Sequence, residues 1–139
     1  MDDACPICQR GRPVDVVTEL AGAWVTLPPR APVAGYVVVV ARRHVREPYE
    51  LPTSERRAFW DAVDLVAEAI QAGLRPDKLN YEIHGNTIPH LHLHLFPRWR
   101  GDAFDGRPID PAQAKPRSAE EQQEVLRALA SLAAPAPDR

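Results

Sequence analysis

Three histidines at alternate positions, His90, His92 and His94, are the residues whose types and spacing could do chemistry in this chain. The chain has 5 histidines in all, so most of them gather in this short stretch. In a β-strand, residues i, i+2 and i+4 point to the same face. We therefore expect a strand that closes at Pro97, directs all three imidazoles into one pocket and turns the intervening leucines toward a core.

A row of imidazoles supports several kinds of chemistry, because the group can exchange protons, act as a nucleophile or bind a metal. A neutral imidazole can attack a phosphoryl group and form a covalent intermediate, while its neighbours donate hydrogen bonds to phosphate oxygens. Asn80, Asn86, Thr87 and the backbone around Gly85 could add neutral donors. A zinc site that uses the three histidines is the alternative, for which the local sequence offers only Glu82 as an acidic partner.

Two cysteines, Cys5 and Cys8 in "CPIC", form a second candidate site. In a reducing compartment this spacing suggests a metal half-site or a redox pair before it suggests a structural disulfide. Two thiolates cannot complete a tetrahedral site alone. Histidines would have to supply the other ligands, and His44 and His84 are the two outside the triad, although the position of His84 favours a turn.

Length and charge limit the possible classes of protein. The 139 residues favour one domain over residues 1–134, with a disordered tail at 135–139. The net charge of −2 lacks the basic excess of a nonspecific nucleic-acid binder. Neither a membrane-spanning apolar run nor a signal peptide is evident. We therefore expect a cytoplasmic protein with no nucleic-acid or membrane partner.

Hydrophobic patterns predict several strands. Residues 14–20 and 21–27 are short β-branched runs that suit a hairpin, and residues 78–85 suit another short strand. Residues 36–44 form a nearly continuous apolar run, which is typical of a strand buried on both faces. Residues 98–115 lack periodicity, so we expect a long surface loop there.

Two helices are predicted from apolar residues that recur every three or four positions. The longer helix should run from Thr53 to about Gly73, with Thr53 or Ser54 as its cap and the glycine at its end. A last helix should begin at Ser118, which is placed to form a capping box with Glu121.

The stretch "HLHLHLFPR" resembles the histidine triad family pattern of three histidines separated by apolar residues. "LFPRWRGDAF" is similar to its continuation in the fragile histidine triad, or dinucleoside-polyphosphate hydrolase, branch. "PPRAPVAGYVVVVARRHV" resembles the family's proline-rich turn, buried strand and following histidine. The resemblance covers roughly residues 5 to 104. It implies an α+β fold: an antiparallel sheet of about five strands, one long helix packed on it, a C-terminal helix, and assembly as a homodimer.

The resemblance also implies an activity. Family members act on nucleotides, so this chain would be a nucleotide hydrolase or nucleotidyl transferase acting at the α-phosphorus of dinucleoside polyphosphates or nucleoside phosphoramidates. His92 would attack and form a nucleotidyl-histidine, His94 would bind the phosphate or leaving group, and His90 would lie beside them. The alternatives are a nucleotide-binding or sensing module without turnover, and a metalloenzyme in which the triad holds catalytic zinc.

Substrate contacts follow by analogy with the family. The residues similar to its phosphate, ribose and nucleoside contacts are Asn80, Gly85, Asn86, Thr87, Trp24 and Leu27. The last two could equally be part of the hairpin core. The chain departs from the family pattern at Tyr36, where a histidine is common, at Thr26, where an aspartate often holds the ribose, and at Asn86, where glutamine is usual.

A zinc site is implied by related proteins. In galactose-1-phosphate uridylyltransferases and some bacterial histidine triad proteins, a cysteine pair of this spacing binds zinc together with two histidines. The corresponding residues here are Cys5, Cys8, His44 and His90. Four such ligands would make a closed structural site. Without metal, His90 would instead hydrogen-bond near the nucleophile.

Overall fold

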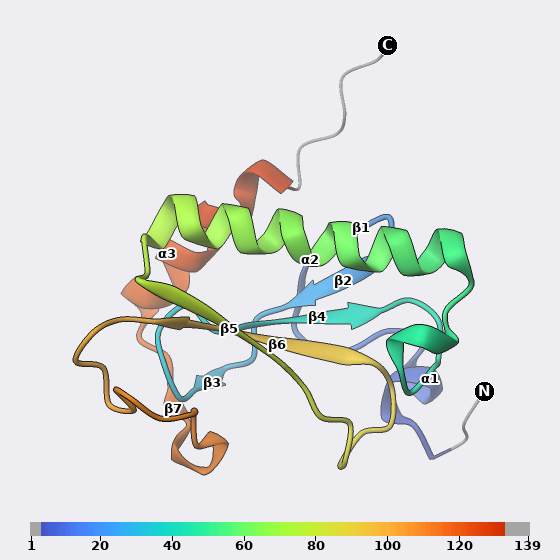
Figure 1. Cartoon of the computed structure of the whole chain (residues 1–139), viewed down its shortest axis with the longest axis horizontal. Helices are drawn as coiled ribbons and strands as arrows, with labels where there is room; N and C mark the ends of the chain where they lie inside the picture. The colour runs from blue at the N-terminus through green and yellow to red at the C-terminus, as the bar shows by residue number, and fades with distance from the viewer. Residues whose placement is uncertain (1–3, 133–139) are drawn as a thin grey trace.

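The computed structural model describes residues 4–132, so the predicted tail at 135–139 lies outside the described residues. A five-stranded antiparallel sheet forms the centre of the fold (Figure 1). Its strands, in spatial order, are β1 (Val16–Leu20), β2 (Ala23–Thr26), β4 (Val37–Ala41), β6 (His92–Arg98) and β5 (Lys78–Ile83). This architecture confirms the predicted α+β class.

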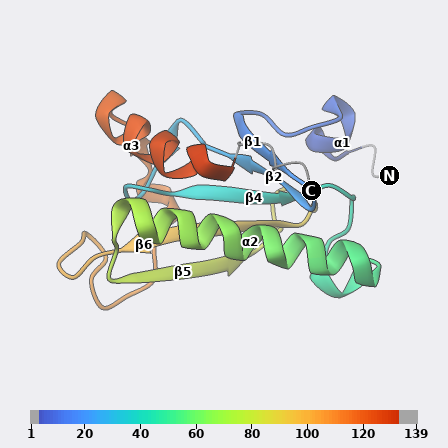
Figure 2. The ribbon, with the colours of Figure 1, turned by 90° about the horizontal axis from the view of Figure 1, so that it is seen from above.

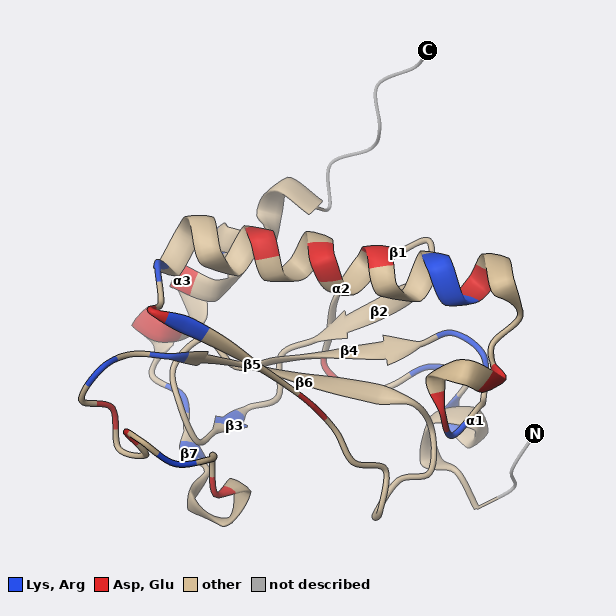
Figure 3. Ribbon diagram, in the orientation of Figure 1, with Lys and Arg blue, Asp and Glu red and all other residues tan. Residues whose placement is uncertain are grey.

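Helices cover one face of the sheet. The long helix α2 (Thr53–Leu74) crosses that face, and α3 (Ala119–Leu129) lies beside it (Figure 2). Phe59, Val66 and Ile70 of α2 are buried against the sheet, whereas its Asp61, Asp64 and Glu68 are exposed. Figure 3 shows where the acidic positions fall along the helix. Burying such an apolar side chain stabilises a fold by about 1.5–3 kcal/mol, so this face supplies much of the core.

Alternate residues of the central strands face opposite sides of the sheet. Val39, Leu93 and Leu95 are buried under α2, as the leucine pattern predicts. Val38 of β4 pairs with His94 of β6, and both belong to the other face. His92 and His94 lie on this face, opposite α2.

The ends of α2 differ from the prediction. Pro52 precedes the helix and no side chain caps it, so the predicted cap at Thr53 or Ser54 is wrong. The helix ends at Leu74, and the residue that caps it in the left-handed conformation is Arg75, with a φ of 55°, and not Gly73. A Cβ on Gly73 would lie 2.6 Å from the Cβ of Ala128. The glycine therefore serves the close approach of α3.

Strand β6 begins at His92, so His90 precedes it, and it continues through Pro97, which we expected to close it. The pairing with β4 ends at Leu95, whereas Pro97 pairs with Leu79 of β5. A proline is tolerated there because the strand has only one paired neighbour at that point.

The segment after β6 is more ordered than the long loop we predicted. Arg98 and Asp102 form an ion pair at 2.8 Å, and Phe104 is 1% exposed. A short helix, η2 (Pro111–Gln113), and strand β7 (Lys115–Pro116) follow, and β7 pairs with β3 (Arg30–Ala31). Long-range contacts thus fix a segment that has no local pattern.

Three short helices complete the described structure. The "CPIC" stretch forms α1 (Pro6–Arg10), η1 (Pro48–Glu50) precedes α2, and η3 (Ala130–Leu132) follows α3. Ser118 caps α3 as predicted, because its side chain accepts a hydrogen bond from the Glu121 amide. No helix among residues 4–132 has the length and apolar composition needed to cross a membrane.

Candidate active site

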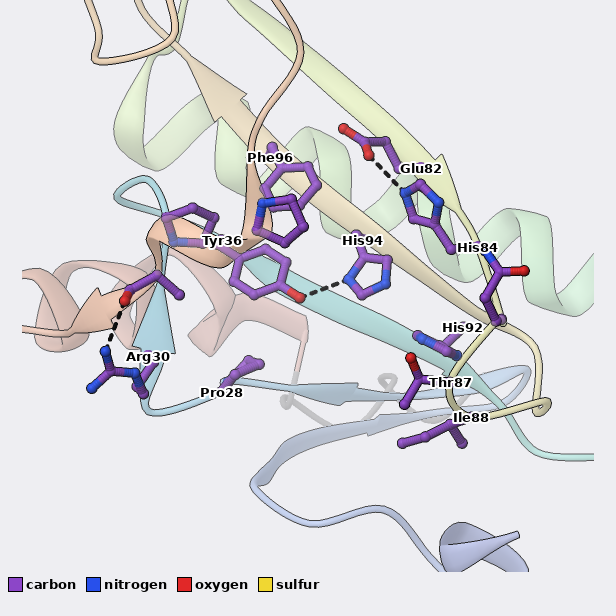
Figure 4. Close-up of a pocket in the computed structure, with 15 residues that line it drawn as sticks. Pro28, Arg30, Tyr36, Glu82, His84, Thr87, Ile88, His92, His94 and Phe96 are labelled. Carbon is purple, nitrogen blue, oxygen red and sulfur yellow. Dashed lines mark hydrogen bonds and ion pairs between the residues drawn. The ribbon is translucent and has the colours of Figure 1, made fainter. Parts of the chain in front are cut away.

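A pocket of about 490 Å³ opens on the face of the sheet opposite α2 (Figure 4). His92 and His94 project into it from β6, and the turn after β5 contributes Gly85, Asn86 and Thr87. The structure therefore brings five of the sequence-predicted site residues together around one cavity.

The tautomer of His92 is fixed by the backbone. Its Nδ1 lies 2.6 Å from the carbonyl oxygen of His90. A carbonyl oxygen can only accept, so Nδ1 carries the proton and donates it. In the neutral ring, Nε2 is then left with a lone pair. This is the state that a nucleophilic imidazole requires.

The tautomer of His94 is fixed by Tyr36. The hydroxyl of Tyr36 lies 2.6 Å from Nδ1 of His94. Burial raises the pKa of Tyr36 to about 12, although Arg117 opposes this, so the hydroxyl keeps its proton and can donate it to Nδ1. Burial, reinforced by His92 and His84, lowers the pKa of His94 to about 4. His94 is therefore neutral near pH 7, and with Tyr36 as the donor the proton of His94 lies on Nε2.

His84 and Glu82 are among the pocket residues that the sequence did not place in the site. His84, which we placed in a turn, lines the pocket, and its Nε2 lies 2.8 Å from Oε1 of Glu82. The alternation that identifies the triad also applies to β5, where Glu82 and the adjoining His84 share a face with Asn80. Asn80 itself is not among the lining residues, because its side chain accepts a hydrogen bond from Arg98 at 2.9 Å.

A second pocket of about 210 Å³ lies on the other side of His92. Pro28, Ile88 and His92 line both cavities, and Thr26 lines the second. The imidazole of His92 thus stands at the junction of two spaces that a two-part substrate could fill.

The structure does not bring Trp24 or Leu27 to either pocket. Leu27 is buried in the core beneath α2. Trp24 shares a face with Thr26 but lies two residues earlier in β2, where the Arg42 guanidinium is 4.7 Å from its ring centre. Both side chains are buried in core clusters, which favours the alternative that they are part of the hairpin core, and their contact with a nucleoside stays a prediction.

A separate cluster joins the four residues predicted to hold metal, Cys5, Cys8, His44 and His90. One ligand atom from each lies within 4.8 Å of all the others. The Cys5 Sγ to His90 Nδ1 distance is 3.6 Å, Cys8 Sγ to His44 Nδ1 is 3.2 Å, and the two Nδ1 atoms are 3.3 Å apart. A tetrahedral zinc site places its ligand atoms roughly 3.3–3.8 Å apart, so the cluster fits such an ion.

His90 is oriented for this role. It is 2% exposed, and its Nε2 lies 2.7 Å from the carbonyl oxygen of Ala41, to which it donates. Nδ1 is then the atom with a lone pair, and it faces the sulfur atoms. The expectation that all three imidazoles share one pocket is therefore wrong for His90, although its backbone carbonyl holds His92.

Comparison with known proteins identifies the family. Residues 11–101, well over half of the chain, match the HIT domain, and the chain belongs to this family. It is 32% identical over 90 residues to the asymmetrical bis(5'-nucleosyl)-tetraphosphatase of Schizosaccharomyces pombe, which covers 61% of this chain. The chain spans about half of that relative, 48% of its length.

Solved structures agree with this assignment. A histidine triad protein from Bradyrhizobium japonicum is 27% identical and superposes with a TM-score of 0.76, covering 86% of this chain and 91% of its own. A zinc-bound histidine triad family protein from Mycobacterium smegmatis is 25% identical with a TM-score of 0.67, covering 93% and 95%. The likeness extends over most of both chains in each case.

Proposed function

We propose that this protein is a nucleotide hydrolase or nucleotidyl transferase acting at the α-phosphorus of dinucleoside polyphosphates or nucleoside phosphoramidates. A covalent nucleotidyl-His92 is the intermediate. The observation that supports this most is the different hydrogen-bond partner of each ring, since a backbone carbonyl holds Nδ1 of His92 and leaves its Nε2 to attack, while the Tyr36 hydroxyl holds Nδ1 of His94 and leaves its Nε2 to donate. The name of the yeast relative supports the dinucleoside polyphosphate class.

The chemistry runs in two steps. Nε2 of His92 bonds to the α-phosphorus as the bond to the leaving oxygen or nitrogen breaks, and the electron pair departs with that atom. The Nε2–H of His94 hydrogen-bonds the charge that develops on a leaving oxygen, whereas a leaving nitrogen takes up a proton from solvent as the bond breaks. Water then attacks phosphorus, the phosphorus–nitrogen bond breaks, its electron pair returns to His92, and a proton is released to solvent.

The two cavities suggest where the parts of a substrate bind. The nucleoside of the transferred nucleotide occupies the pocket that Thr26 lines, with the Thr26 side chain in the position of the family's ribose contact. Gly85, Asn86 and Thr87 supply neutral donors around the phosphate. Donors placed next to the phosphate suit this protein, because its net charge of −2 gives no general attraction for an anion.

The Cys–His cluster binds a structural zinc ion in this proposal. Zinc would cross-link α1 to the segment after β4 through His44 and to the segment before β6 through His90, whose carbonyl orients His92. The zinc-bound relative supports the choice of metal. A paired-thiol site of this kind favours a reducing compartment, so we also propose a cytoplasmic location.

A catalytic zinc held by the triad has less support. Within residues 4–132, the one group of ligand atoms close enough to hold a metal includes His90 but neither His92 nor His94. The other alternative is a module that binds nucleotides without turnover. Measuring turnover distinguishes such a module from the proposed enzyme.

Replacing His92 by alanine tests the proposal. His92→Ala should abolish turnover, because it removes the Nε2 atom that attacks phosphorus, while nucleotide affinity stays within a few-fold of wild type. Steady-state rates and calorimetric binding would be measured together, with the melting temperature as a control for folding. Undiminished turnover in the variant would refute the mechanism, and tight binding by a wild type that turns nothing over would favour the sensing module.

A further inference from the structure

The large pocket extends beyond the two histidines toward Phe96. Phe96 occupies the next same-face position of β6 after His92 and His94, about 13 Å along the strand from His92. Its ring lies 4.7 Å from that of Tyr36 with an angle of 9° between the planes, and it is within 8° of parallel to His94. These near-parallel rings give the cavity an aromatic wall, as the Tyr36 and Phe96 sticks show (Figure 4).

The facing wall comes from parts of the chain that are distant in sequence. Arg30 and Pro32 follow β2, whereas Pro111 and Ala114 belong to the segment around η2. Pro111 and Ala114 lie beyond residue 101, where the match to the HIT domain ends. This wall is therefore built in part by sequence that the shared domain does not include.

Several contacts hold the facing wall in place. Arg30 Nη2 donates to the Ala114 carbonyl at 2.8 Å, and β3 pairs with β7. The side chain of Arg117 is 2% exposed, donates to the Pro28 carbonyl at 2.6 Å and pairs with Glu121. A wall fixed in this way can discriminate between ligands by shape.

The outer part of the pocket, here called the outer chamber, is bounded by Tyr36, Phe96, Arg30, Pro111 and Ala114. On the basis of the proposed function, we propose that the outer chamber binds the leaving group and selects one with a flat ring. A planar base suits parallel aromatic and proline walls. Arg30 and Lys115 place positive charge on β3 and β7 (Figure 3), which suits phosphates attached to such a ring. The favoured leaving group is thus a second nucleoside phosphate.

The order of His92, His94 and Phe96 along β6 matches the path from the attacked phosphorus to the far end of the leaving group. When the bond between the α-phosphorus and the bridging oxygen breaks, that oxygen keeps the electron pair and lies next to His94. The rest of the departing nucleoside phosphate extends toward Phe96. A small amine, in contrast, leaves the outer chamber empty and gains nothing from it.

Filling the chamber tests this inference. Ala114→Trp places a large ring in it, and Ala112→Trp is the matched control, since Ala112 is exposed in the same segment and does not line the pocket. Each variant would be assayed with diadenosine triphosphate and with adenosine 5'-phosphoramidate, which share the transferred nucleotide. Melting temperatures confirm folding, and Arg30→Gln provides a milder second variant.

The inference predicts that the ratio of kcat/KM for the dinucleotide to that for the phosphoramidate falls about tenfold or more in Ala114→Trp. Arg30→Gln should lower the same ratio by less, and Ala112→Trp should leave it near the wild-type value. An unchanged ratio in Ala114→Trp would overturn the leaving-group assignment. If wild type forms no adduct on His92 from either substrate, the proposed function itself fails, which is a separate result.

Discussion

At the scale of residues, two adjacent histidines receive opposite roles from different partners. The ring centres of His92 and His94 are 4.9 Å apart, yet one Nδ1 donates to a backbone carbonyl and the other hydrogen-bonds a tyrosine hydroxyl. In the proposed function, one ring offers a lone pair and the other an N–H bond. Identical side chains can take different roles when the groups that hydrogen-bond to them differ.

Tyr36→Phe tests the role of the tyrosine as a positioning residue. The variant keeps the ring that stacks on Phe96 but removes the donor that fixes His94. We expect kcat to fall roughly 10- to 100-fold, with a smaller change in KM, because the N–H of His94 no longer points reliably from Nε2. Steady-state kinetics give the two constants separately. An unchanged kcat, with the fold intact, would contradict this role.

The lowered pKa of His94 also predicts a pH-dependent stability. Its folded pKa is about 4, below the ordinary value of 6.5. As the pH falls from 6.5 toward 4, the unfolded chain binds a proton that the native chain does not, so the free energy of unfolding decreases. Urea titrations should show a shallower decrease for His94→Asn than for wild type. The other titrating groups are common to both proteins, and equal slopes would contradict the assignment.

At the scale of elements, local sequence patterns predicted the strands and helices but not all of their contacts. The period of two placed His92 and Leu93 on opposite faces, and the helical period located α2. The caps of α2 were missed because Pro52 and Arg75 lack the usual sequence signals. The remaining features of the fold depend on tertiary contacts, which a local sequence pattern does not contain.

The candidate site illustrates the same limit. Tyr36, Glu82 and His94 come from three chain segments, and they meet only because of the strand register. The sequence therefore marked Tyr36 as a departure without revealing its partner. The ordered structure of the segment after Arg98 could not be predicted from the local sequence either, because it depends on the ion pair with Asp102 and on the pairing of β7 with β3.

Metal removal tests how the elements around the Cys–His cluster are joined. The purified protein should contain about one zinc per chain, and a chelator should lower the melting temperature by several degrees or more, because the cross-link among α1, β4 and β6 is lost. Elemental analysis and calorimetry measure the two quantities. Cys8→Ser should reproduce the loss.

Two results would contradict the structural assignment of the metal. One is a chain that binds no metal at all. The other is a chelated protein that melts at the same temperature but has lost its chemistry, which would favour a catalytic ion.

At the scale of the whole molecule, the two edges of the sheet differ in what they expose. Strand β5 is an edge strand, and its Tyr81 is 48% exposed. Trp60 and Leu65 of α2 are also exposed apolar side chains. Unpaired edges invite pairing with another chain, so we propose that β5 mediates a homodimer.

Light scattering with size-exclusion chromatography tests this assembly. Wild type should have twice the mass of one chain, which is 15.5 kDa. Tyr81→Lys should shift it toward monomer, because a charge at the interface is costly to bury. Val14→Lys is a suitable control, since Val14 is exposed near the opposite edge. A wild-type monomer at micromolar concentration would exclude the dimer.

The most direct test of the account is to trap the covalent intermediate. Wild type mixed with a dinucleoside polyphosphate labelled at the α-phosphorus and quenched within milliseconds should hold the label as an acid-labile phosphoramidate. Mass analysis of the peptide that spans β6 should place it on His92. Rapid turnover with no label on the protein, or label on a residue other than His92, would contradict the mechanism.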